Sequence, residues 1–160
     1  MFEIDVISGR RLRIRESVAI RGLFRQIAAE DEALPEEDLV RSSTPPCAII
    51  LGAYRRGGLI IGMTFFAPFY KTFDEWGYIW NGAVDEQDRG RGLGTKLVKQ
   101  ASVLAIRAEK RYLLAITSIP ATQAFLCSCG FVKATGPILQ QFRSLKPRDE
   151  HGAFFLDLKR

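Results

Sequence analysis

The sequence predicts a mixed α/β fold in which a largely antiparallel central sheet is flanked by helices. Three observations support this fold class. Several short segments are rich in β-prone residues, other segments repeat apolar residues at helical spacing, and a glycine-rich turn separates three successive strands from the longest helix. The chain has 160 residues, of which 47% are hydrophobic, and this is enough for one core. We therefore expect a single domain over residues 1–160.

The N-terminal part is expected to contain one strand and two helices. Polar and apolar residues alternate from Arg11 to Arg15, as in a half-buried strand. Ser17 can cap the helix that follows. Apolar residues at helical spacing mark that helix: Ile20, Leu23, Phe24, Ile27 and Ala28. An acidic stretch with Pro35 should end it, before a shorter helix near residues 36–41.

Three strands are expected next. The apolar stretches 48–54 and 59–66 are joined by Arg-Arg-Gly-Gly, which predicts a hairpin. A third strand should span residues 78–84. The loop before it, from Phe65 to Trp76, interleaves aromatic residues with acidic ones. This loop could bind an amine through its rings and carboxylates, or it could form the surface of a homodimer.

The second half alternates helices and strands. Apolar residues form one stripe from Leu93 to Ala108, which indicates an amphipathic helix, and residues 112–117 then read as a strand. Pro120 suits the first turn of another helix, and Gly130 can end that helix as a left-handed cap. Residues 153–158 should form the last strand.

The glycine-rich segment carries the clearest chemistry. Residues 89–94 read Arg-Gly-Arg-Gly-Leu-Gly and open the long helix. Glycines let the backbone approach a ligand, and amides at a helix N-terminus attract anions, so a pyrophosphate suits this place. A Walker loop is absent, because the segment ends in Gly-Thr-Lys. A dinucleotide fingerprint fits poorly, because Thr95 occupies the position of its third glycine.

The pattern Arg-x-x-Gly-x-Gly, in this order of elements, resembles the GNAT superfamily of N-acyltransferases. Cys129-Gly130-Phe131 likewise looks like the Leu-Gly-Phe ending of the family's short helix. The resemblance covers most of the chain and implies a sheet splayed between strands 4 and 5. It also implies that acetyl-CoA pairs with the backbone at Val84. The pyrophosphate would then be held by the amides of Arg89, Gly90, Arg91, Gly92, Leu93, Gly94 and Thr95.

The catalytic groups of the family are less evident here. Many members carry a tyrosine acid in the short helix, but Leu126 stands at that position, and Ile119 replaces a frequent asparagine. Cys127, Ser128 and Tyr112 are conceivable substitutes for the acid. Glu75 and Tyr78 are the candidate catalytic residues, with Asn81 as a holder of water. Each of these has an alternative interpretation as an ordinary surface or core residue.

The expected activity is transfer of an acetyl group from acetyl-CoA to a primary amine, by direct attack in a ternary complex. The alternative is a non-catalytic acyl-CoA-binding module of the same fold. The acceptor would be a small-molecule or peptide amine, and the sequence does not identify it.

Composition excludes several other classes. The net charge of +5 is spread along the chain without a nucleic-acid-binding motif, so we expect no nucleic-acid partner. No apolar run is long enough for a membrane span, and the N-terminus lacks a signal peptide, which predicts a cytoplasmic protein. Three cysteines without zinc spacing predict no metal, and the lone His151 has no evident catalytic partner.

Overall fold

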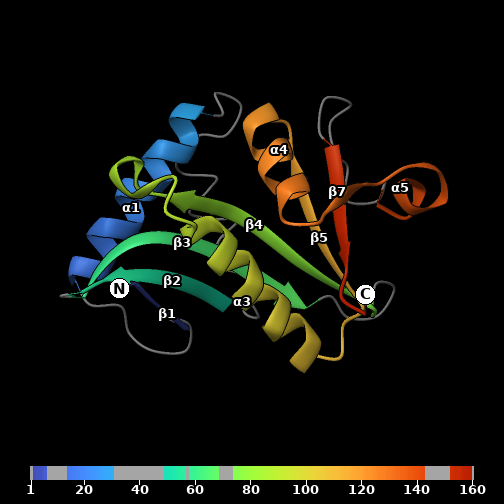
Figure 1. Ribbon diagram of the computed structural model, residues 1–160, viewed down its shortest axis with the longest axis horizontal. Coiled ribbons are helices and arrows are strands. Elements are labelled where there is room, and N and C mark those ends of the chain that lie inside the picture. Colours follow the sequence, from blue (N-terminus) through green and yellow to red (C-terminus); the bar gives the residue numbers. More distant parts are fainter. Residues whose placement is uncertain are drawn as a thin grey trace. The chain divides into compact units, whose positions relative to one another are not determined.

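A computed structural model describes residues 2–6, 14–30, 49–56, 58–68, 74–142 and 152–159 (Figure 1). The strands are β1 (Phe2–Val6), β2 (Ile49–Arg55), β3 (Leu59–Pro68), β4 (Trp76–Val84), β5 (Tyr112–Thr117), β6 (Val132–Lys133) and β7 (Gly152–Asp157). The helices are α1 (Ile14–Glu30), the 3₁₀ segment η2 (Glu86–Asp88), α3 (Leu93–Arg107), α4 (Pro120–Ser128) and α5 (Gly136–Phe142).

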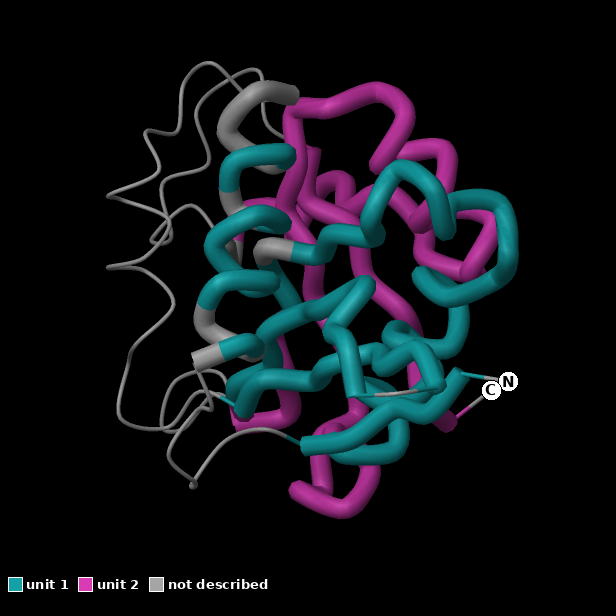
Figure 2. The backbone as a smooth tube through the Cα atoms, turned by 90° about the vertical axis from the view of Figure 1, so that its left-hand side faces the viewer, with its two compact units in different colours: residues 1–67, 79–104 teal, residues 68–78, 105–160 magenta. Residues whose placement is uncertain are grey.

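The chain forms two compact units, which Figure 2 draws in teal and magenta. Unit 1 consists of Met1–Ala67 and Ile79–Leu104, and unit 2 consists of Pro68–Tyr78 and Ala105–Arg160. Strand β4 and helix α3 each contribute residues to both units. The expected single domain therefore stays a prediction, as does the splay between strands 4 and 5.

Unit 1 is an antiparallel meander covered by a helix. Strand β1 pairs with β2, which pairs in turn with β3, and both pairings are antiparallel. Helix α1 buries Ile20 and Leu23 in a cluster with β3 residues, among them Met63 and Phe65. Phe65 also stacks on Trp80 of β4 at a centroid distance of 5.7 Å. Burial of these side chains holds α1 against the meander.

Unit 2 has a second antiparallel sheet segment with its own core. Strand β7 pairs with β5 and with β6, both antiparallel. Trp76 lies at the centre of the core, because its ring stacks on Tyr112 at 4.5 Å and meets Phe155 edge-on at 6.0 Å. Leu114 and Ala153 are fully buried in the same cluster.

Most elements expected after residue 48 are confirmed. The hairpin of β2 and β3, the strand β4, the helix α3 and the strand β5 lie within a few residues of their expected bounds. The mixed α/β fold class and the largely antiparallel pairing are confirmed as well. Helix α5 and segment η2 were not expected.

The N-terminal prediction was wrong in its first element. Helix α1 already begins at Ile14, so Ile14 and Arg15 of the expected strand are helical, and Ser17 lies inside the helix rather than at its cap. Residues 11–13 lie outside the described residues. The first strand is instead β1, whose residues Phe2 to Val6 alternate in burial and pair with β2. Five alternating residues are too short a pattern to separate a strand from a helix. The expected helix at 36–41 lies outside the described residues.

The predicted aromatic loop is shorter than expected. Strand β3 continues to Pro68, and Phe65, Phe66 and Trp76 are buried, so these rings belong to the two cores and offer no surface to a substrate or a partner. Residues 69–73 lie outside the part of the chain that the structure describes.

Candidate functional site

The glycine turn has the backbone conformation that its sequence requires. Strand β4 ends at Val84, and Asp85 caps η2 by accepting a hydrogen bond from the Gln87 amide at 3.1 Å. Gly90 and Gly92 then have φ values of +74° and +76°. L side chains rarely adopt this left-handed region, so the alternating glycines are a conformational requirement of the turn.

The same turn leaves open space at the start of α3. The Lys96 amide donates to the Gly92 carbonyl at 3.1 Å, so the amides of Leu93, Gly94 and Thr95 precede the pairing within the helix. A Cβ atom built on Gly90 or Gly92 would meet no protein atom within 4 Å. The space beside the turn therefore admits a ligand, and the positive end of the helix dipole favours an anion.

A buried carboxylate holds this turn in place. The Asp88 side chain is 0% exposed, yet it forms ion pairs with Arg55 at the end of β2 and with Arg91 in the turn, the latter at 2.9 Å. Two charge-assisted hydrogen bonds compensate the desolvation of the carboxylate. The sequence analysis missed this contact, because Arg55 is 33 residues away and only the strand register brings it close.

Two further contacts fix the end of β4. The Arg89 Nε donates to the Val84 carbonyl at 3.1 Å, and the Asp85 amide donates to the Ile61 carbonyl at 2.8 Å. Gly62 lies so close to this end that an added Cβ would stand 3.2 Å from the Ala83 carbonyl oxygen. Arg89, expected to contribute only a backbone amide, thus also braces the strand that enters the turn.

Helix α4 ends as the sequence predicted. The Phe131 amide donates to the Leu126 carbonyl at 3.1 Å and the Gly130 amide to the Cys127 carbonyl at 3.0 Å, while Gly130 has a φ of +92°. This is a Schellman cap. Leu126 is 3% exposed, so its side chain packs in the core of unit 2 and offers no proton.

Two of the three substitutes considered for the missing acid, Cys127 and Ser128, lie at the same cap, whereas Tyr112 lies in β5. Ser128 is exposed, and its hydroxyl donates to the Phe125 carbonyl at 2.6 Å. Cys127 is an exposed free thiol, and Cys129 is a partly buried one. Tyr112 stacks on Trp76 and carries the Arg111 guanidinium 4.8 Å from its ring centroid.

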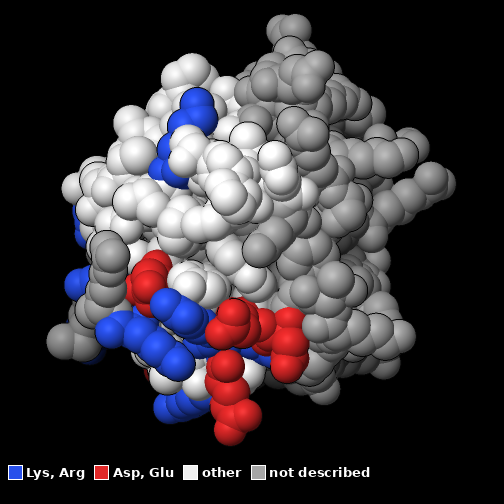
Figure 3. All heavy atoms as spheres, turned by 90° about the vertical axis from the view of Figure 1, so that its right-hand side faces the viewer, with Lys and Arg blue, Asp and Glu red and all other residues white. Residues whose placement is uncertain are grey.

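The two candidate catalytic residues lie at the start of β4, in unit 2. Glu75 is exposed, and its backbone carbonyl accepts hydrogen bonds from the Arg111 and Tyr112 amides at 2.8 and 3.0 Å. Charges of both signs surround it in the structure, since Lys110 pairs with Asp74. On the face shown in Figure 3, acidic and basic side chains gather next to one another in the same way.

Tyr78 is part of a core rather than of an open surface. It packs against the cluster around Trp76, and burial raises the pKa of its phenol to about 12. At neutral pH the hydroxyl therefore keeps its proton and cannot serve as a base. Asn81 lies in β4, and its side chain is outside the described part.

Two other features concern the whole chain. Among the described residues, no group of three or more His, Cys, Asp or Glu side chains is arranged to hold a metal ion. Within the same ranges, no helix has the length and the hydropathy needed to cross a membrane.

Comparison with known proteins gives a consistent result. The sequence model of the Acetyltransferase (GNAT) family matches residues 18–131. No curated protein matches the chain. Among solved structures, Tetrahymena GCN5 is similar with a TM-score of 0.77, 18% identity and coverage of 99% of this chain and 96% of the other.

Two more structures extend this similarity. A GNAT-family acetyltransferase from Staphylococcus aureus has a TM-score of 0.73, 14% identity and coverage of 98% and 99% of the two chains. A Bacillus anthracis protein solved in complex with acetyl coenzyme A has a TM-score of 0.55, 24% identity and coverage of 71% and 64%. At these identities the likeness shows a shared fold.

Proposed function

Because the chain belongs to the GNAT family of acetyltransferases, we propose that it transfers an acetyl group from acetyl-CoA to a primary amine. One observation supports the choice of donor above all others. The turn at Gly90 and Gly92 opens directly onto the N-terminus of α3, with space beside it and unpaired helical amides ahead of Lys96. Such a turn suits the pyrophosphate of a coenzyme A thioester.

In this proposal the residues of the chain divide the work between binding and orientation. The amides of residues 89–95 hold the pyrophosphate, and the backbone at Val84 aligns the thioester arm. The neutral amine attacks the thioester carbonyl directly, so no acyl-enzyme forms. A backbone amide near Val84 polarises that carbonyl, and positioning supplies most of the acceleration.

Because Leu126 cannot donate a proton, the departing thiol must leave without an acid from this position. A thiol of ordinary pKa of about 8.5 leaves as a thiolate at a cost on the order of 2 kcal/mol near neutral pH, so water can protonate it afterwards. The proposed reaction therefore needs no dedicated acid on α4. Glu75 remains the proposed contact for the acceptor ammonium, and the amine itself belongs to a small molecule or a peptide.

A second function is favoured by a specific observation. Leu126 has no proton to donate and Tyr78 keeps its proton, so at neutral pH Leu126 cannot act as the acid and Tyr78 cannot act as the base. A non-catalytic acyl-CoA-binding module would need neither group. Release of free thiol from acetyl-CoA in the presence of an amine panel separates the two functions, because a binding module gives no turnover above hydrolysis.

The cofactor site is tested by a matched pair of variants. Gly92→Glu and Gly58→Glu both place a charged side chain at a left-handed glycine without neighbours within 4 Å, with φ values of +76° and +84°. The two changes should therefore impose a similar backbone strain of about 1–2 kcal/mol. Only Gly92→Glu adds bulk and negative charge beside the proposed pyrophosphate position.

Calorimetric titration with acetyl-CoA should distinguish the pair. We expect micromolar binding by the parent and by Gly58→Glu, and a loss of about 100-fold or more in Gly92→Glu, because like charges repel at short range. Melting curves of both variants control for folding. Tight binding by a folded Gly92→Glu variant would remove the glycine turn from the proposed site.

A further inference from the structure

The hairpin of β2 and β3 contains a β-bulge close to its tip. Ala53 of β2 pairs with Gly62, but the next residue, Tyr54, pairs with Ile60, so Ile61 is an extra residue on β3. A bulge leaves its extra residue outside the regular ladder, and bulges are common next to functional sites. The backbone of Ile61 can therefore make a contact outside the hairpin.

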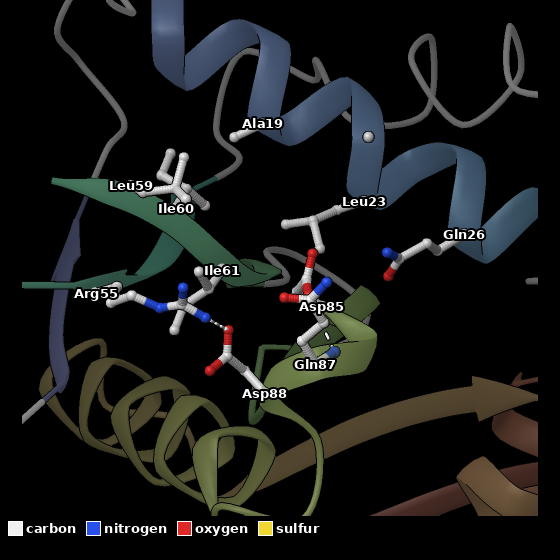
Figure 4. A pocket seen from close by; sticks show the side chains of 11 residues that line it. Ala19, Leu23, Gln26, Arg55, Leu59, Ile60, Ile61, Asp85, Gln87 and Asp88 are labelled. Atoms are coloured by element: carbon white, nitrogen blue, oxygen red, sulfur yellow. Dashed lines mark hydrogen bonds and ion pairs between the residues drawn. The ribbon is translucent and has the colours of Figure 1, made fainter.

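This contact goes to the segment that leads into the glycine turn. The Asp85 amide donates to the Ile61 carbonyl at 2.8 Å. A second contact lies close by, because Arg55 at the end of β2 forms an ion pair with the buried Asp88 (Figure 4). The tip of the hairpin thus holds segment η2 at two points, one through the backbone and one through side chains.

The alternation of side chains along β2 places Arg55 for this contact. Leu51 and Ala53 are both 0% exposed, and Arg55 is the next residue on the same face of the strand. Its side chain is 45% exposed, so it ends a buried row while part of it stays in water. Partial hydration lowers the desolvation cost of pairing with a buried carboxylate.

The two oxygens of Asp88 bind different arginines. The Arg55 Nη2 donates to Oδ2, and the Arg91 Nη1 donates to Oδ1 at 2.9 Å. A carboxylate is a planar group with two acceptor oxygens, so a guanidinium that fixes one oxygen also fixes the direction of the other. Arg55 therefore determines where Asp88 presents the oxygen that Arg91 binds.

The glycine turn has a conformational reason to need this anchor. Arg91 lies between Gly90 and Gly92, whose φ values are +74° and +76°. Glycine has more backbone freedom than other residues, and freedom that is lost on binding lowers the affinity for a ligand. An anchor at Arg91 restricts the turn before a ligand arrives, which favours binding.

We propose that Arg55 is a positioning residue of the acetyl-CoA site, which acts through Asp88 on Arg91 and so orders the glycine turn before the cofactor binds. The expected effect on acetyl-CoA affinity rests on the proposed function. The effect on the order of the turn needs no cofactor and can be measured separately.

Calorimetric titration with acetyl-CoA compares Arg55→Gln with Arg56→Gln. Arg56 is the next residue of the hairpin and is exposed, so its change removes the same charge but keeps both partners of Asp88. We expect Arg55→Gln to raise the dissociation constant about 3- to 10-fold, because the turn must then be ordered on binding, and Arg56→Gln to change it less than about twofold. Arg55→Lys keeps one charged donor and should stay within about twofold of the parent.

A double variant shows whether Arg55 acts through Arg91. If it does, adding Arg55→Gln to Arg91→Gln should raise the dissociation constant by less than about twofold, because the anchor is already absent. Melting curves show that each variant is folded. Effects that multiply in the double variant would mean that Arg55 acts independently of Arg91.

Hydrogen exchange measures the order of the turn without a cofactor. The Asp88 amide donates to the Asp85 carbonyl at 2.9 Å, and the Gly130 amide of unit 2 donates to the Cys127 carbonyl at 3.0 Å. We expect Arg55→Gln to accelerate exchange of the Asp88 amide at least about fivefold and to leave the Gly130 amide at the parent rate, because the change loosens one segment locally.

Three results overturn the proposal. They are equal exchange of the Asp88 amide in Arg55→Gln and the parent, equal acetyl-CoA affinity in Arg55→Gln and Arg56→Gln, and multiplying effects in the double variant. A parent protein that does not bind acetyl-CoA overturns the proposed function instead. Exchange of the Asp88 amide alone then decides whether Arg55 orders the turn.

Discussion

Replacing Asp88 by Asn should destabilise unit 1 and weaken the proposed cofactor site together. Asparagine keeps the shape of the side chain but removes the negative charge that binds Arg55 and Arg91. The arginine in the turn then loses its anchor, although the glycines keep their conformation. The effect links a buried contact in the core to the geometry of the turn.

The size of the effect follows from burial. Breaking a buried ion pair costs about 3–5 kcal/mol when the remaining charge stays buried. Here the remaining charges are arginines with side chains 45% and 57% exposed, so water resolvates them and the expected loss falls to about 2–3 kcal/mol. For a chain of this length, that corresponds to a decrease of about 5–10 °C in the melting temperature.

The assay combines thermal melting with acetyl-CoA titration. Reordering the Arg91 side chain on binding should cost about 0.5–1.5 kcal/mol, which raises the dissociation constant about 2- to 13-fold. Glu86→Gln is the control, because it removes an exposed carboxylate from the same segment η2 and leaves no buried charge behind. That control should cost less than about 1 kcal/mol.

Two results would refute this reasoning. A melting temperature of Asp88→Asn within about 1 °C of the parent would show that the buried ion pairs do not stabilise unit 1. An equal loss in Glu86→Gln would show that burial does not set the size of the effect.

Three further predictions concern unit 2. The raised pKa of Tyr78, from 10.0 to about 12, means that the stability it contributes is complete below pH 10 and is lost as the pH rises through 12. Tyr78→Phe should remove that alkaline loss in pH-dependent unfolding, and an unchanged alkaline profile would contradict it. Leu126→Tyr should lower the free energy of unfolding by about 1–3 kcal/mol, because it overpacks a buried position. Leu126→Met is the control and should lower it by less than about 1.5 kcal/mol. A tyrosine variant as stable as the parent would contradict this and reveal space beside α4. Glu75→Gln should raise KM for the amine or lower kcat without changing acetyl-CoA affinity, and parent values of both constants would show that Glu75 is a solvated charge.

Local sequence patterns determined the parts of this protein that depend on neighbouring residues. The glycine-rich turn before α3, the cap at Gly130 and the strand Tyr112–Thr117 were all predicted by the sequence. Positive φ angles, helix caps and hydrophobic periodicity are properties of a few consecutive residues, so a sequence carries them directly.

Short sequence patterns failed as predictors where a strand and a helix can share the same alternation of polar and apolar residues. Residues 11–15 alternate like a strand, but α1 begins at Ile14, and the equally short alternation at Phe2–Val6 forms the real edge strand. The choice is made by pairing, since β1 pairs with β2, about fifty residues later. Tertiary contacts therefore override local preference in such segments.

Only the tertiary structure decided which side chains meet. The ion pair of Asp88 with Arg55 and the close approach of Gly62 to Ala83 join residues from different elements. Their distances depend on strand register and on how a helix packs, and a shift of one residue in register would send every side chain to the other face. The sequence thus predicted the glycine turn as a place for an anion, whereas the fold determined which side chains hold that turn.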